Sequence, residues 1–112
     1  YAKGDKFMAY PFSVRFIYNE EQTENNSKLS ILIIAPKRYQ KLAVNRNRAK
    51  RLLRESYRLN KHSLQKKIIN SSSQLFISIA LVSKTMPDYS LTEQKIKEIL
   101  STIEKKIFSE ND

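Results

Sequence analysis

Three segments of the chain carry the hydrophobic patterns of β-strands. Within residues 10–18, apolar side chains occupy every second position: Phe12, Val14, Phe16 and Tyr18. This spacing predicts a strand with one buried face, while Ser13, Arg15 and Ile17 face the other way. Residues 29–35 and 75–82 are apolar at nearly every position. Both are therefore predicted to be strands covered on two faces, and we expect residues 29–35 to be a central strand.

Two further segments have helical patterns. A basic helix is predicted over residues 42–60, and residues 59–70 either continue it or form a short second helix. Near the C-terminus, Ser90 and Glu93 have the S-x-x-E spacing of a capping box and predict the start of a last helix. This helix should pack on the sheet through one stripe of Ile96, Ile99, Leu100, Ile103 and Ile107.

The order of these elements predicts the fold class. Strand, strand, helix, strand, helix is typical of an α+β two-layer sandwich, in which helices pack on one face of a small mixed sheet. We expect one domain over residues 1–112, with residues 19–28 as a solvated hairpin loop. Residues 29–35 and 75–82 should pair in parallel through a strand-helix-strand crossover, which by the general rule is right-handed.

Composition adds a strong positive charge. The formal net charge is +10, which predicts a polyanionic partner such as nucleic acid, a membrane surface or an acidic protein. No stretch approaches the roughly 18 apolar residues of a membrane span, and no signal peptide is evident, so we expect a cytoplasmic protein without a membrane partner. Because there is no cysteine and one histidine, His62, we expect no disulfide, no zinc site and no cofactor bound by the protein alone.

The charge is concentrated in the sequence RNRAKRLLRESYR, residues 46–58. On a helical wheel one arc of roughly 140° collects polar side chains, and the other side collects Ala49, Leu52, Leu53 and Ser56. Arg48 lies just beyond that apolar arc. The members of the basic arc are Arg46, Asn47, Lys50, Arg51, Arg54 and Arg58.

Two interpretations of this arc are open, a solvated helix face or a phosphate-binding surface. A solvated face usually alternates charges at i, i+4, yet Glu55 is the only acid between Lys37 and Lys67, which favours nucleic-acid binding. Glu55 itself is expected to pair locally with an arginine. RNA is favoured over DNA, because strands precede this helix where a helix-turn-helix protein would have helices.

The residues Arg46-Asn47-Arg48, then Lys50-Arg51 and Arg54-Glu55, resemble the RNR signature of the bacterial ribonuclease P protein component. The resemblance extends to Gly4 and the aromatic strand, to Pro36-Lys37-Arg38 after a strand, and to the terminal helix, so it covers almost the whole chain. It implies an accessory subunit that binds the catalytic ribonuclease P RNA and the 5′ leader of precursor tRNA. The RNA then carries out the hydrolysis with Mg²⁺, and the crossover is left-handed, contrary to the general rule.

The same resemblance assigns residues to roles. The RNA-binding set is Lys37, Arg38, Lys41, Arg46, Asn47, Arg48, Lys50, Arg51, Arg54 and Arg58, with no catalytic residue and no metal ligand in the protein. A leader cleft on the sheet is assigned to Phe12, Arg15 and Phe16, although the alternation of the two phenylalanines also fits a plain core. Relative to that family, we expect the basic N-terminal segment to be missing here or cut to YAKG. A structural RNA-binding protein, such as a ribosomal protein of similar fold, is the alternative function.

Overall fold

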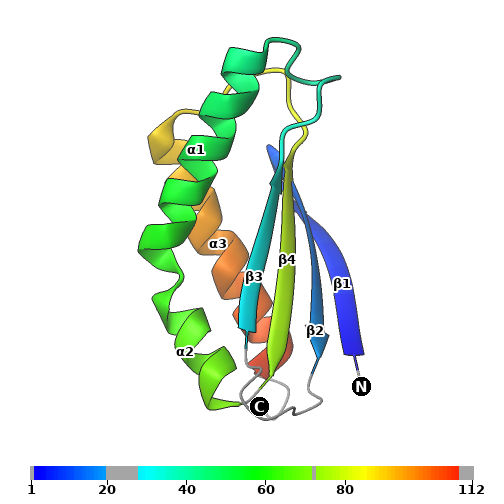
Figure 1. Ribbon diagram of the computed structural model, residues 1–112, viewed down its shortest axis with the longest axis vertical. Coiled ribbons are helices and arrows are strands. Elements are labelled where there is room, and N and C mark those ends of the chain that lie inside the picture. Colours follow the sequence, from blue (N-terminus) through cyan, green and yellow to red (C-terminus); the bar gives the residue numbers. More distant parts are fainter. Residues whose placement is uncertain (1, 20–27, 72, 109–112) are drawn as a thin grey trace.

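The computed structural model describes residues 2–19, 28–71 and 73–108. For residues 2 and 3 it describes the backbone only. Figure 1 shows strands and helices in two layers. In chain order the elements are β1 (Ala2–Ala9), β2 (Phe12–Asn19), β3 (Lys28–Ile34), α1 (Ala43–Asn60), α2 (His62–Asn70), β4 (Gln74–Leu81) and α3 (Tyr89–Phe108).

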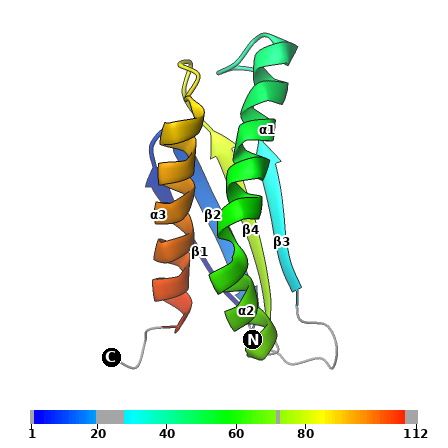
Figure 2. The same ribbon diagram turned by 90° about the vertical axis from the view of Figure 1, so that its left-hand side faces the viewer.

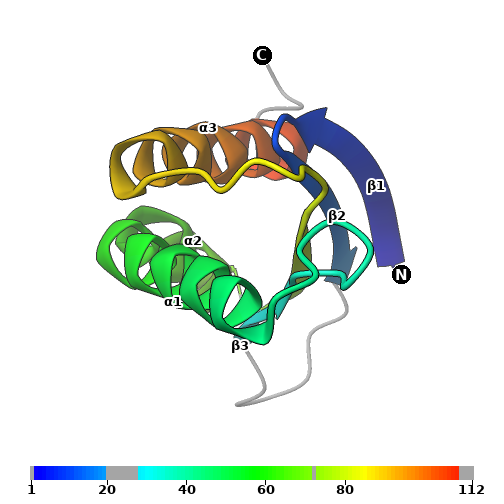
Figure 3. The same ribbon diagram turned by 90° about the horizontal axis from the view of Figure 1, so that it is seen from above.

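The four strands form one mixed sheet in the order β1-β2-β4-β3. Strand β4 is antiparallel to β2 and parallel to β3, and β1 is antiparallel to β2. Helices α1, α2 and α3 lie on one face of the sheet, and the opposite face carries no helix in the described part of the chain (Figure 2 and Figure 3). The predicted α+β two-layer class and the parallel pairing of β3 with β4 are confirmed, whereas the hand of the crossover stays a prediction.

The core lies between the sheet and the helices. Every second residue of β2 is buried in the predicted phase, and so is every second residue of β4, because successive strand side chains point to opposite faces. The predicted α3 stripe is buried against them. Complete burial of one such side chain contributes about 1.5–3 kcal/mol to stability, so the alternation in β2 determines which face meets the helices. The largest fully buried core residues are Phe12, Phe16, Leu53, Leu64, Ile68, Leu75, Ile77, Ile79, Leu81, Ile96, Ile99 and Ile103.

Strand β3 is an edge strand, so the expectation that it is central was wrong. It has β4 on one side, and its side chains Leu32 and Ile34 are exposed on the helix-free face at 48% and 37%. The continuous apolar run correctly indicated that both faces of the strand are apolar. It did not show whether other parts of the fold bury both faces. The hairpin expectation was also wrong, because β4 lies between β2 and β3; the acidic residues 20–24 lie outside the described part.

Strand β1 was not anticipated from the sequence. Its residues Gly4, Asp5 and Lys6 do not alternate between apolar and polar, and the strand forms by pairing with β2 along its whole length. Half-buried Phe7 packs against the core. From the helix layer, Lys106 Nζ of α3 forms an ion pair with Asp5 Oδ2 at 2.9 Å. This contact, together with a hydrogen bond from the Lys6 backbone N–H, holds the pKa of Asp5 below its usual value.

The start of α3 differs from the predicted capping box. Asp88, directly before the helix, accepts a hydrogen bond from the Leu91 backbone N–H at 2.8 Å. Its carbonyl also accepts one from the Thr92 hydroxyl at 2.8 Å. An aspartate satisfies a free N–H at the helix start as well as a serine does, so the helix begins at Tyr89, two residues earlier than a cap at Ser90 would predict.

Candidate nucleic-acid interface

Helix α1 is amphipathic in the sense that the sequence predicts. Ala49, Leu53 and Ser56 are buried, and Leu52 is half-buried. Tyr57 is buried as well, which the wheel did not anticipate, and burial raises the pKa of its phenol to about 12. On the solvent side, the exposed members of the predicted RNA-binding set are Asn47, Arg48, Arg51, Arg54 and Arg58, while Arg46 and Lys50 are half-buried at the margin.

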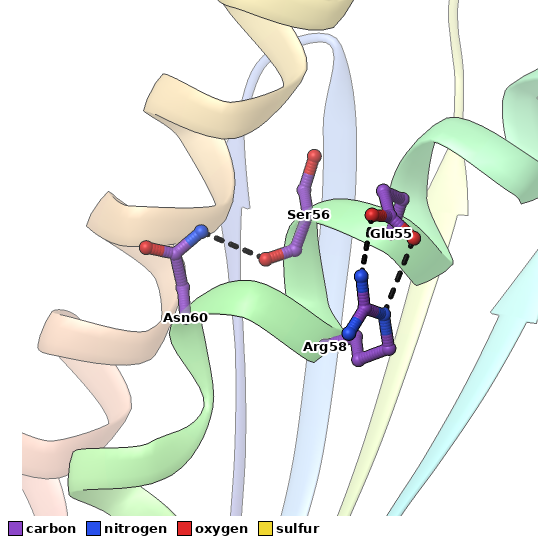
Figure 4. Close-up of polar contacts among 4 residues, drawn as sticks. All are labelled: Glu55, Ser56, Arg58 and Asn60. Atoms are coloured by element: carbon purple, nitrogen blue, oxygen red, sulfur yellow. Dashed lines mark hydrogen bonds and ion pairs between the residues drawn. The ribbon is translucent and has the colours of Figure 1, made fainter.

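Acidic partners are scarce on this helix. Within the described residues, Arg58 is the α1 cation that forms an ion pair, through two hydrogen bonds to Glu55 at 2.7 and 3.3 Å (Figure 4). These bonds hold the pKa of Glu55 below its usual value. Local pairing of Glu55 is thereby confirmed. Solvent screens both charges of an exposed pair of this kind, so it restrains Arg58 only weakly.

The loop before α1 extends the positive charge. Lys37, Arg38 and Lys41 are exposed, in a turn where the Pro36 carbonyl accepts hydrogen bonds from the Tyr39 and Gln40 backbone N–H groups, both at 3.1 Å. This loop lies at the same end of the molecule as the first turn of α1 (Figure 1). We call this loop and the exposed side of α1 the basic surface, made of Lys37, Arg38, Lys41, Asn47, Arg48, Lys50, Arg51, Arg54 and Arg58.

Arg46 differs from the other arginines of the helix. Its Nη1 donates hydrogen bonds to the backbone carbonyls of Gln40 at 3.1 Å and Lys41 at 2.9 Å. The guanidinium is thus bound to the loop and is half-buried. Of the predicted RNA-binding set, Arg46 is the member whose charge faces the protein's own backbone.

The leader cleft that we expected at Phe12, Arg15 and Phe16 must be corrected. Phe12 and Phe16 are 0% and 1% exposed, beneath the helices, so neither ring can stack on a base and the core alternative is the right one. Arg15 points to the opposite face and is exposed. The three residues therefore do not form one site, because neighbouring positions of a strand face opposite sides of the sheet.

The helix-free side of the sheet, which we call the open sheet face, combines apolar and basic groups. Cross-strand register places Arg15 between Lys6 and Ser78, and Ile17 next to Phe76. The face is hollowed beside Ile17 and Phe76, in a depression of about 410 Å³ that extends to Lys28 and Ser30 of the β3 side. Its exposed large apolar side chains are Met8, Ile17, Leu32, Ile34 and Phe76.

Sequence reasoning missed two residues of this region. Phe76 was not recognised as a surface residue, because its strand was expected to be buried on both faces. Its position next to Ile17 follows once the antiparallel register is known. Gln40 is 3% exposed and binds the Ser83 carbonyl, and no sequence signal marked it. His62, the single histidine of the chain, is exposed at the start of α2.

Comparison with known proteins identifies the family of this chain. The family described as Ribonuclease P matches residues 1–104. The chain belongs to the ribonuclease P protein family. Among curated relatives, the Ribonuclease P protein components of two Porphyromonas gingivalis strains are each 34% identical over 103 residues, covering 92% of this chain and 74% of the relative. No solved structure matches the chain significantly.

The family match covers both candidate surfaces, the open sheet face and the basic surface. In the described residues, no group of three or more His, Asp or Glu side chains is placed to hold a metal ion. No helix of the described part is long and apolar enough to cross a membrane. The side chains that this ribonuclease P family member exposes at these surfaces can neutralise charge, donate hydrogen bonds and make apolar contacts.

Proposed function

We propose that this chain is the protein subunit of a bacterial ribonuclease P, which matures the 5′ end of tRNA together with a catalytic RNA. The observation that carries the proposal is the basic surface. Nine polar or cationic side chains lie along one loop and one helix, and Glu55 is the single acid in α1. Repulsion among these cations is relieved when phosphates bind, so the surface is suited to an RNA partner.

Binding of the catalytic RNA is assigned to the basic surface. Arginine guanidinium groups make two-pronged contacts to phosphate oxygens and remain charged at any cellular pH. Such contacts position the protein without reading base sequence. They also release counterions, so affinity should fall steeply as salt rises.

Binding of the precursor tRNA leader is assigned to the open sheet face. Arg15 and Lys6 supply charge for leader phosphates, and Phe76 with Ile17 supplies an apolar platform for unpaired bases. Stacking of a base on an aromatic ring is worth about 1–3 kcal/mol and tolerates any base, which suits leaders of variable sequence. Because α1 packs against β3, an edge of this face lies beside α1.

Hydrolysis and the Mg²⁺ that it requires are assigned to the RNA subunit. The protein's contribution is then to hold two polyanions together, since its cations offset the repulsion between substrate and catalytic RNA. A ribonucleoprotein of this kind would work in the cytoplasm, where precursor tRNA is processed.

The leader assignment is tested with two forms of one precursor tRNA, one with and one without the leader, bound to the assembled ribonucleoprotein. Wild-type protein should favour the leader-bearing form. Phe76→Ala with Arg15→Gln should remove most of this preference while binding to the catalytic RNA alone is unchanged. An equal preference in wild type and variant would remove the leader from the open sheet face.

A further inference from the structure

The loop of the basic surface is fastened to the rest of the fold by one buried side chain, Gln40. It is 3% exposed, and its Nε2 donates a 2.7 Å hydrogen bond to the Ser83 carbonyl, which follows β4. The backbone N–H of Gln40 donates to the Pro36 carbonyl at 3.1 Å. A single residue in the middle of the cationic loop thus joins that loop to another segment of the fold.

The segment to which Gln40 is bound is itself well anchored. Ser83 is buried, and its hydroxyl oxygen accepts hydrogen bonds from the Thr85 backbone N–H at 3.1 Å and from the Tyr10 hydroxyl at 3.3 Å. Next to it, the Val82 backbone N–H donates to the Pro11 carbonyl at 2.9 Å. Gln40 therefore attaches the loop to a point that the β1–β2 turn already holds in place.

A second attachment comes from α1. Arg46 Nη1 donates to the backbone carbonyls of Gln40 and Lys41, so the first turn of the helix holds the loop from the other side. The backbone of Gln40 is held at its carbonyl by Arg46, while its side chain is held by Ser83. These contacts fix the position of the loop relative to the exposed arginines of α1.

We infer that Gln40 and Arg46 are positioning residues, which hold the loop cations Lys37, Arg38 and Lys41 in register with the α1 arginines for phosphate binding. This inference rests on the proposed function. Ordering a loop before binding removes an entropic cost that would otherwise oppose the contacts. Gln40 is uncharged, yet we expect it to affect the affinity for RNA because it positions the cations that contact the phosphates.

The test is the affinity of the full chain for a ribonuclease P RNA transcript, measured across a range of salt, for Gln40→Ala. Its affinity should fall about tenfold, which corresponds to the loss of about one charge-assisted hydrogen bond. Its salt slope should also become shallower, although no charge is removed, because displaced loop cations no longer meet phosphates. Gln94→Ala, the same substitution at an exposed position of α3, should change affinity less than twofold.

A double-mutant cycle separates positioning from general damage to the fold. In a background of Lys37→Gln, Arg38→Gln and Lys41→Gln, Gln40→Ala should change affinity less than twofold, because the cations that Gln40 positions are absent. A tenfold loss in both backgrounds, or none in the wild type, would overturn the inference. If the wild-type chain does not bind the RNA at all, the proposed function fails instead.

Two further variants keep the inference testable if Gln40→Ala does not fold. Gln40→Met preserves the volume and removes the donor, and it should reproduce the weaker binding and the shallower slope. Arg46→Lys keeps the charge but shortens the side chain that reaches the two carbonyls, and should weaken binding about fivefold, whereas Lys97→Arg at an exposed position of α3 should change affinity less than twofold. No loss of affinity with Arg46→Lys, or an equal loss with Lys97→Arg, would contradict the assignment of Arg46.

Discussion

Neutralising two exposed arginines of α1 should flatten the salt dependence of RNA binding by a calculable amount. Arg51 and Arg54 are both exposed and, in the part of the chain that the structure describes, neither takes part in an ion pair. Replacing both with glutamine keeps a good helix former on a solvent-facing side, so stability should change by less than about 0.5 kcal/mol.

The expected magnitude follows from counterion release. Each phosphate contact contributes about 0.9 to the slope of log affinity against log salt for a DNA duplex, and with the same value for the paired parts of the RNA two contacts contribute about 1.8. Over a fourfold rise in salt, the wild-type affinity should therefore fall about 12-fold more than that of Arg51→Gln/Arg54→Gln. Filter binding or fluorescence anisotropy with a ribonuclease P RNA transcript measures both slopes.

A matched variant distinguishes phosphate contacts made by α1 from attraction by the total positive charge of the protein. Lys97→Gln/Lys105→Gln removes the same charge from exposed positions of α3. Its slope should lie close to that of the wild type. Equal slopes for the two double variants would refute the placement of the phosphate contacts on α1, because total charge alone would then explain the binding.

Three more predictions concern single residues. Among the described residues, no group hydrogen-bonds the buried Ser56 hydroxyl, so Ser56→Ala should raise the free energy of unfolding by about 1 kcal/mol in chemical denaturation, and a loss of stability would contradict this reading. Glu55→Gln removes the acid that pairs with Arg58, and should strengthen RNA binding a few-fold with little change in melting temperature; weaker binding would count against the basic surface. Burial raises the pKa of Tyr57 to about 12, above its ordinary value of 10.0. The unfolded chain loses this proton first, so the contribution of Tyr57 is intact below pH 10 and is lost as pH rises toward 12. Denaturation across this range should show a smaller loss for Tyr57→Phe than for wild type, and identical losses would refute the shift.

The sequence predicted well those elements in which the spacing of apolar residues is enough to identify the buried face. In β2 and α3 the spacing of apolar residues determines the buried face, and Phe16 and Ile103 are buried accordingly. For α1, the spacing places Arg51 and Arg54 in solvent whatever the topology is. The family resemblance, carried by residues 46–55, is likewise confirmed.

The errors have a common physical origin, since they depend on which strands are neighbours. Strand β3 was expected to be central, and Phe12 and Phe16 were grouped with Arg15, because sequence does not show which face each helix covers or where β4 inserts. Strand β1 has little apolar alternation and forms by pairing with β2. Gln40 escaped notice because its partner, Ser83, lies 43 positions away.

The most direct test of the central claim is cleavage of a precursor tRNA by a ribonuclease P RNA at limiting Mg²⁺, with and without this protein. The account predicts that the protein increases the rate of 5′-leader removal, and that the increase is lost with Arg51→Gln/Arg54→Gln but retained with Lys97→Gln/Lys105→Gln. An unchanged rate despite tight binding of the RNA would contradict a role as the ribonuclease P subunit.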